Sequence, residues 1–348
     1  MSFDLQQLIR NNIRELEPYS SARDEFKGTA RIYLDANENS IGSPLPEAYN
    51  RYPDPLQWQL KEKLGAVKGV PAENIFIGNG SDECIDILLR AVCEPGLDNI
   101  IICPPTYGMY QVCASINNVA VKKVSLTPDF QLDLPALEQA IDDRTKLIFI
   151  CSPNNPTGNT IRREDIEVLL NNYFGLVVLD EAYINFSRFR SFTSDLPDYP
   201  QLVILQTMSK AWGLAGLRVG MAFAGKEIIS VMNKIKPPYN ISSITQQLAT
   251  QALGQVDKVN QMIREIVVQR EELEKALVVL SGVIKVHPSD ANFLLVKVEE
   301  PRKVYQAMLD KGIVLRDRSN VRLCEGALRI TVGTAEENKE LLTVWQAL

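Results

Sequence analysis

The sequence predicts an α/β fold: a large domain with a mostly parallel sheet covered by helices, plus a smaller α+β domain. Short apolar runs alternate with helical patterns through the middle of the chain, which is typical of a parallel sheet with both faces covered. A different mixture of elements follows, and 348 residues suffice for two packed domains. We expect an N-terminal arm over residues 1–30 that packs with the small domain, the large domain over 31–250 and the small domain over 251–348.

The elements can be placed from these patterns. Strands of the large domain are expected at Asn99–Cys103, Ala120–Leu126, Lys146–Cys151, Leu176–Leu179, Leu202–Gln206 and Val219–Ala224. Helices are expected at Leu56–Val67, Asp82–Val92, Leu134–Ile141, Arg163–Tyr173 and, with a break near Gly254, from Ile244 to Leu280. In the small domain, strands are expected at Asn292–Val298, Ile313–Arg316 and Leu328–Val332, around a helix at Arg302–Asp310.

Composition excludes several classes of protein. The net charge is −6 and the basic residues form no run, so neither a nucleic-acid footprint nor a nucleic-acid partner is expected. The six cysteines form no C-x-x-C pair, which is typical of reduced thiols in a cytoplasmic protein. The N-terminus has no apolar signal core and no later segment offers about 18 uninterrupted apolar residues, so no membrane segment is expected. His287, expected in a polar turn, is the single histidine, which argues against histidine triads and most metal sites.

A glycine-rich turn follows the apolar run Ile75–Ile77. Gly80 would let the backbone approach a ligand closely, and Ser81 and Asp82 would begin a helix whose free N–H groups favour a phosphate. Taken alone, a glycine turn with an ordinary N-cap explains the segment equally well. The segment is neither a dinucleotide fingerprint nor a P-loop.

Two further polar residues follow apolar runs, where the ligands of open parallel sheets bind. The amide of Asn154 would project from a strand end and could donate to a phenolate oxygen, although a simple turn is the more common interpretation of this segment. Asp180 ends a run so apolar that its carboxylate needs a cation. A metal shared with Glu181 or a protonated ring nitrogen would serve.

Lys210 follows another apolar run. Burial and a nearby cation should lower its pKa and expose a nucleophilic amine. Hydroxyls at Thr207 and Ser209, with the guanidinium of Arg218, would neutralise a phosphate. A solvated surface lysine and a Ser–Lys hydrolase dyad are the alternatives.

Three motifs together resemble the fold-type-I aminotransferases that use pyridoxal 5'-phosphate (PLP): S-P-N-N-P-T-G, D-E-A-Y and S-K-A-W-G-L-A-G-L-R-V-G. The resemblance implies a PLP-binding large domain in which Lys210 forms a Schiff base and later acts as general base, while Asp180 pairs with the ring nitrogen. It implies that Asn154 and Tyr183 hold the phenolic oxygen and that Tyr107 stacks on the ring. The phosphate would be bound by Gly80, Ser81, Thr207, Ser209 and Arg218, and Asp82 is also expected among the cofactor-binding residues.

Additional segments resemble the histidinol-phosphate aminotransferase family along nearly the full chain: Pro18–Arg23, Leu34–Asn39, Asn50–Pro53, Pro104–Gly108 and Leu328–Gly333. This implies a homodimer with shared sites, in which Tyr52 reaches the partner's cofactor phosphate. It also implies substrate binding by Tyr19, Asn37, Arg316 and Arg329, with histidinol phosphate and glutamate or 2-oxoglutarate as substrates. Arg318 and Arg322 are expected to be ordinary surface residues. Asp35 and Ser40 depart from the family's frequent asparagine and proline.

The implied activity is ping-pong amino transfer in histidine biosynthesis. The alternatives are an aromatic amino acid aminotransferase or a threonine-phosphate decarboxylase on the same scaffold. A non-catalytic PLP-binding regulator is the remaining alternative, and it would need a DNA-binding domain that the first thirty or so residues do not suggest.

Overall fold

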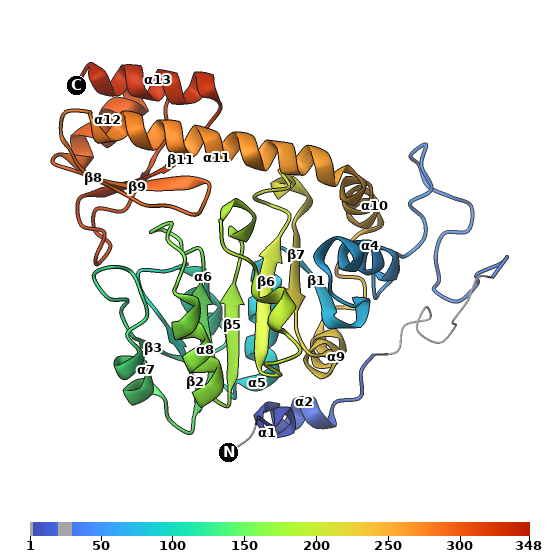
Figure 1. Cartoon of the computed structure of the whole chain (residues 1–348). Coiled ribbons are helices and arrows are strands. Elements are labelled where there is room, and N and C mark those ends of the chain that lie inside the picture. The colour runs from blue at the N-terminus through green and yellow to red at the C-terminus, as the bar shows by residue number, and fades with distance from the viewer. Residues whose placement is uncertain (1–2, 20–29) are drawn as a thin grey trace.

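The computed structural model describes residues 3–19 and 30–348, and it has a large lobe and a small lobe (Figure 1). The large lobe is built on a seven-stranded sheet of order β1-β7-β6-β5-β4-β2-β3. Its strands are β1 Ile75–Asn79, β2 Asn99–Ile102, β3 Ala120–Lys123, β4 Thr145–Cys151, β5 Leu176–Asp180, β6 Leu202–Thr207 and β7 Val219–Phe223. Only β7 runs antiparallel to its neighbours, β1 and β6. The predicted α/β fold with a mostly parallel sheet is confirmed.

Helices cover both faces of this sheet, as the continuous apolar strands require. They are α4 Trp58–Lys68, α5 Ser81–Val92, α6 Met109–Ile116, α7 Leu134–Ala140, α8 Arg163–Asn172, α9 Lys226–Ile235 and α10 Ser243–Ala252. Strand β1 shows how two cores arise, because Ile75 and Ile77 point into one and Phe76 into the other. Short 3-10 segments lie at Ala72–Asn74, Ile184–Phe186, Phe192–Asp195, Ala215–Leu217 and Leu253–Gln255.

The small lobe has a four-stranded antiparallel sheet of order β10-β11-β9-β8. Its elements are α11 Val256–Val278, β8 Val283–His287, β9 Phe293–Val298, α12 Pro301–Asp310, β10 Arg316–Asp317, β11 Ala327–Thr331 and α13 Ala335–Gln346. The strand expected at Ile313–Arg316 is shorter and later than predicted, because only Arg316 and Asp317 pair with β11. His287 lies at the end of edge strand β8, not in a turn. Because β8 is mostly solvated, it lacks the apolar run that would have predicted a strand.

The N-terminal arm packs on the large lobe in the part that the structure describes. Helices α1 Leu5–Leu8 and α2 Asn11–Glu15 lie at the far end of the molecule from the small lobe (Figure 1). Leu5 and Ile9 are buried in the core beneath α5, and the Arg10 N–H donates to the carbonyl of Ala91 over 3.1 Å. The expected packing against the small domain is therefore wrong for this segment, because its apolar pair completes a core of the large lobe. Residues 20–29 lie outside the described part.

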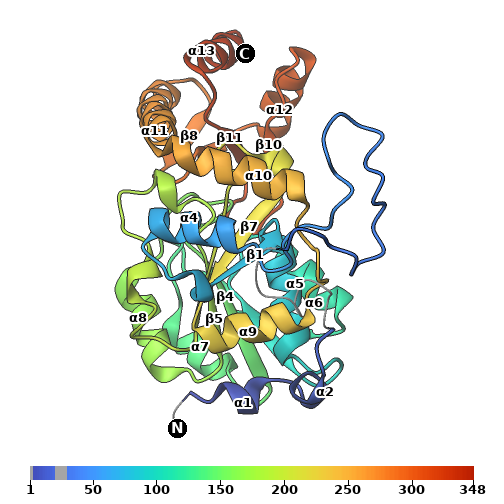
Figure 2. The same ribbon diagram turned by 90° about the vertical axis from the view of Figure 1, so that its right-hand side faces the viewer.

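Residues 30–53 form an extended segment that stands away from the body of the large lobe (Figure 2). It exposes large apolar side chains, among them Leu34 at 84% and Ile41 at 97%.

Within residues 3–19 and 30–348, no helix combines the length and the apolar character needed to cross a membrane.

Candidate active site

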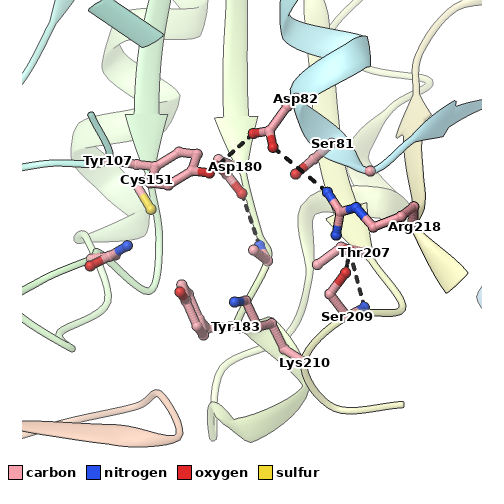
Figure 3. Close-up of a pocket in the computed structure, with 13 residues that line it drawn as sticks. Ser81, Asp82, Tyr107, Cys151, Asp180, Tyr183, Thr207, Ser209, Lys210 and Arg218 are labelled. Atoms are coloured by element: carbon pink, nitrogen blue, oxygen red, sulfur yellow. Dashed lines mark hydrogen bonds and ion pairs between the residues drawn. The ribbon is translucent and has the colours of Figure 1, made fainter. Parts of the chain in front are cut away.

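A cavity opens at the carboxyl ends of β4, β5 and β6, beside the N-terminus of α5 (Figure 3). It encloses about 510 Å³ of space that is partly open to solvent. The predicted site residues that line it are Gly80, Ser81, Asp82, Tyr107, Asp180, Tyr183, Thr207, Ser209, Lys210 and Arg218. Cys151, Asn155 and Ala182 line it as well. The fold thus gathers side chains that lie more than a hundred residues apart along the chain.

One side of the cavity is built to approach an anion closely. Gly80 has a φ of 73° and directs the chain into α5, whose first N–H groups have no partner within the helix. Gly220 lies opposite Gly78 in the β1–β7 ladder, and a Cβ on Gly220 would overlap the backbone nitrogen of Ser81. This position therefore requires glycine. The result is a close backbone cradle at a helix N-terminus, which fits a phosphate.

Hydrogen-bond donors from the β6–β7 connection complete this cradle. Arg218 has a φ of 55°, and its Nη2 lies 3.8 Å from the Asp82 carboxylate. The hydroxyl of Thr207 lies 2.9 Å from that of Ser209 and accepts the Ser209 N–H over 3.1 Å. Figure 3 shows Ser81, Asp82 and Arg218 on one side of the cavity, with Lys210 and Tyr183 on the other. A guanidinium, two hydroxyls and helix N–H groups match the chemistry of a dianionic phosphate.

Asp180 is the buried acid of the site, with only 3% of its surface exposed. Its Oδ2 accepts a hydrogen bond of 2.6 Å from the Tyr110 hydroxyl, and its Oδ1 accepts one of 3.0 Å from the Ala182 N–H. Burial raises the pKa of Asp180, and these two donors oppose that rise. No ion pair among the described residues involves Asp180, so a buried carboxylate faces the cavity with neutral donors alone. A protonated ring nitrogen would supply the missing cation.

Lys210 faces the same cavity from the β6–β7 connection, and its Nζ lies 5.6 Å from the centre of the Tyr183 ring. Its side chain is partly exposed, yet desolvation lowers its pKa, and the positive charges of Arg329 and Arg218 lower it further. The carboxylates of Asp180 and Asp82 act in the opposite direction. The net lowering makes a neutral, nucleophilic amine more available near neutral pH.

Two tyrosines border the space between these groups. Tyr183 is buried, and its ring meets that of Phe293 edge-on with centroids 5.1 Å apart, which joins the large lobe to β9 of the small lobe. The hydroxyl of Tyr107 donates to the Asp82 carboxylate over 3.1 Å. Both rings line the cavity, at positions suited to contact a planar ligand.

The structure corrects the prediction for Asn154. Its amide is buried beside the cavity and donates to the Pro105 carbonyl at 2.8 Å and to the Thr157 hydroxyl at 2.7 Å. One of these hydrogen bonds joins the loop to the β2–α6 connection and the other lies within the loop, and Asn154 does not line the cavity. The next residue, Asn155, lines it instead and accepts a hydrogen bond of 2.6 Å from Arg329. Sequence reasoning could not distinguish two adjacent asparagines, because the path of the loop decides which amide faces the ligand.

Three further predicted residues, Asn37, Tyr52 and Tyr19, lie away from this cavity. Asn37 and Tyr52 line a separate hollow, where the rings of Tyr52 and Tyr239 stack with centroids 4.5 Å apart. Tyr52 remains 51% exposed and Tyr19 remains 75% exposed. Within one chain these side chains take no part in the cavity.

The arginines of the small lobe are arranged as a cross-strand set. Arg316 lies directly opposite Arg329 in the β10–β11 ladder, the former exposed and the latter half-buried. Arg318 differs from its predicted surface role: it is half-buried, and its Nε has no acceptor within residues 3–19 and 30–348. Burial, followed by the charges of Arg329 and Arg316, lowers the pKa of Arg318. The sequence places Arg316 and Arg318 two positions apart, a spacing that puts side chains on the same face of an extended chain.

Residues 37–344 match the family model of aminotransferase class I and II. The chain belongs to this family. It is 53% identical to a histidinol-phosphate aminotransferase of Cytophaga hutchinsonii over 344 residues, which is 99% of each chain. It is also 53% identical to one of Parabacteroides distasonis over 339 residues, or 97% of each chain. At this identity and coverage, it is a member of the histidinol-phosphate aminotransferase family.

A solved structure supports the same assignment. The histidinol-phosphate aminotransferase of Sinorhizobium meliloti, in complex with pyridoxal 5'-phosphate, is 26% identical and superposes with a TM-score of 0.79. The match covers 90% of this chain and 89% of the other. The predicted fold, the aminotransferase class and the PLP dependence of the family are confirmed.

Proposed function

We propose that this chain transfers the amino group of histidinol phosphate to 2-oxoglutarate, giving imidazole acetol phosphate and glutamate, with PLP held in the cavity around Lys210. The observation that carries the proposal is one cavity that joins a lysine of lowered pKa, a buried aspartate with no ion pair among the described residues, and a phosphate cradle. A metal site or a Ser–Lys hydrolase would use only part of this set. PLP matches each of the three features.

The side chains have separate tasks. Gly80, Ser81, Thr207, Ser209 and Arg218 would bind the phosphate, Asp180 the ring nitrogen, and Tyr183 with Asn155 the phenolic oxygen. Bound PLP supplies a carbonyl for the substrate amine and an electron-withdrawing ring that acidifies the adjacent carbon.

Proton movement belongs to Lys210. Its Nζ accepts the proton from the carbon that bears the substrate amino group, and returns it later in the cycle. The lowered pKa of Lys210 suits this work, because the amine must be neutral to accept a proton. The phosphate cradle and Asp180 keep the reacting groups at Nζ throughout.

The substrates of both half-reactions carry anions, and the small lobe supplies cations for them. Arg329 contacts the edge of the site, since it donates to the lining residue Asn155 over 2.6 Å and its charge acts on Lys210. Arg316 lies opposite it on the neighbouring strand. Two guanidiniums can bind the phosphate of histidinol phosphate and a carboxylate of glutamate in turn.

The substrate proposal is tested with purified protein, PLP, histidinol phosphate and 2-oxoglutarate, by measuring glutamate. Formation of glutamate is expected, together with its loss in Lys210→Ala and its retention in Lys303→Ala, a surface control whose side chain forms an ion pair with Glu300. Parallel assays with phenylalanine and with threonine phosphate test the two alternatives on this scaffold. Faster turnover of phenylalanine, or release of carbon dioxide from threonine phosphate, would contradict the proposal.

We further propose that two copies share their active sites in the cytoplasm, with Tyr52 reaching the partner's cofactor phosphate. Tyr52 is half exposed, with its ring stacked on Tyr239, near the end of the segment 30–53 that stands out from the large lobe (Figure 2). The same segment exposes Leu34 and Ile41. Mixed refolding of Tyr52→Ala and Lys210→Ala tests this, because a hybrid dimer then has one intact site. Recovery of part of the wild-type activity is expected; hybrid dimers that stay inactive would refute site sharing.

A further inference from the structure

Tyr110 lies beneath the active site, outside the lining of the cavity. It is on α6 and fully buried, at 0% exposure. Its ring stacks on Phe149 with centroids 4.8 Å apart and meets Tyr107 edge-on at 5.6 Å. Rings held on two sides leave the hydroxyl little freedom, so its position is fixed by packing.

That hydroxyl donates to Oδ2 of Asp180 over 2.6 Å, while the Ala182 N–H donates to Oδ1 over 3.0 Å. Each carboxylate oxygen therefore has one donor among the residues that the structure describes. The short phenol bond is typical of a donor to an ionised oxygen. The two donors hold the carboxylate in one orientation. Because each oxygen can accept more than one hydrogen bond, the carboxylate can still accept another from a group in the cavity.

We propose that Tyr110 is a positioning residue, which keeps Asp180 ionised and aimed at the ring nitrogen of bound PLP. The inference rests on the proposed function and extends it to a side chain that touches neither substrate nor cofactor. Burial pushes Asp180 toward its protonated form, and the phenol opposes this by stabilising the carboxylate. Without the phenol, the proton shared between ring nitrogen and Asp180 shifts toward the aspartate, and the ring withdraws electrons less strongly.

A neutral donor suits this position better than a cation. A lysine or arginine here would neutralise Asp180 and compete with the ring nitrogen for its charge. Burial and the nearby Asp180 raise the pKa of Tyr110 well above its ordinary value, so the phenol stays neutral and keeps its proton to donate. The other titratable groups that act on or respond to Asp180 are Cys84, Tyr107, Cys151, Tyr183, Asp82 and Lys210.

The test compares Tyr110→Phe with Tyr173→Phe in the holoenzyme. Tyr173 is a matched control, since it is also buried and its hydroxyl donates to a backbone carbonyl, that of Thr145, over 2.9 Å. PLP labelled with ¹⁵N at the ring reports protonation through its chemical shift, and dilution of the holoenzyme reports PLP affinity. In Tyr110→Phe we expect a shift toward the unprotonated ring and about 10- to 100-fold weaker binding of PLP. Tyr173→Phe should match wild type in both.

A double variant separates positioning from packing. On an Asp180→Asn background, Tyr110→Phe should change PLP affinity by less than about twofold, because the group it acts through is gone. Additive losses would overturn the inference. So would an unchanged ¹⁵N shift in Tyr110→Phe beside a wild type that binds PLP. A wild type that binds no PLP would instead refute the proposed function.

A measurement on the unmodified holoenzyme covers the case in which Tyr110→Phe does not fold. The ¹³C-carboxyl signal of Asp180, assigned by its loss in Asp180→Asn, should be that of an ionised carboxylate at pH 7. A protonated carboxyl would overturn the inference.

Discussion

The two lobes place their functional charges by different rules. In the large lobe, parallel strands bring Asp180 and Lys210 to one edge of the sheet, where the acid is buried among neutral donors. In the small lobe, antiparallel pairing sets Arg316 opposite Arg329, and the former is exposed. The parallel sheet thus forms a preorganised, desolvated centre. The small antiparallel sheet places partly exposed arginines beside that centre. The lobes meet where Arg329 contacts Asn155 and Phe293 contacts Tyr183.

The largest expected effect concerns the buried acid. Asp180→Asn should lower kcat by about 100-fold or more, because the amide keeps the shape but cannot hold a proton on the ring nitrogen. Steady-state glutamate formation measures it. Glu181→Gln is the matched control: Glu181 is equally buried at the same strand end, but it lies outside the cavity and accepts from the Phe192 N–H over 2.8 Å.

Glu181→Gln should instead cost about 1–3 kcal/mol of unfolding free energy, because it weakens a buried hydrogen-bond network. Its kcat should stay within about threefold of wild type. An equal loss of kcat in Asp180→Asn and Glu181→Gln would contradict the prediction, because it would show that any buried acid at this strand end affects kcat, whether or not it faces the cavity.

An intermediate effect is expected from the small-lobe arginines. Arg329→Gln should raise KM for histidinol phosphate and for 2-oxoglutarate by about 10- to 100-fold, since it removes a half-buried cation. Arg316→Gln should raise them by less than about tenfold, because exposed charges are screened by solvent. Initial-rate kinetics with each substrate varied measure both. A larger rise in KM for Arg316→Gln than for Arg329→Gln would contradict the expected order of the two arginines.

The smallest expected effect is on the pH dependence of the free energy of unfolding. Burial, with help from Lys285 and Lys297, lowers the pKa of His287 from 6.5 to about 4, so folding favours the neutral imidazole. The contribution of His287 to the free energy of unfolding is complete above pH 6.5 and decreases as the pH falls toward 4. The total decrease should be less than about 3 kcal/mol. His287→Gln should therefore lose less stability than wild type over this window, as measured by urea unfolding at several pH values. Parallel pH curves for both proteins would remove His287 as the cause.

Most of the large lobe could be predicted from the sequence, because its strands are buried on both faces and read as continuous apolar runs. The secondary structure of the small lobe is harder to predict from the sequence. Edge strand β8 is largely solvated, and α13 depends on a capping box at Thr334 and Glu337 that alone predicts only a helix start. The expectation that the arm packs with the small domain is wrong for residues 3–19, because an apolar pair such as Leu5 and Ile9 can complete any nearby core.

The chemistry of the site could be predicted from the sequence because three motifs jointly resemble those of fold-type-I aminotransferases, although each motif alone has an ordinary structural explanation. The folded chain was needed to see that Asn155, and not Asn154, faces the cavity. It also revealed Tyr110, whose contact with Asp180 spans 70 positions of the chain. Strand ends are encoded locally, whereas the direction of a loop amide and the partner of a buried carboxylate depend on how distant segments pack.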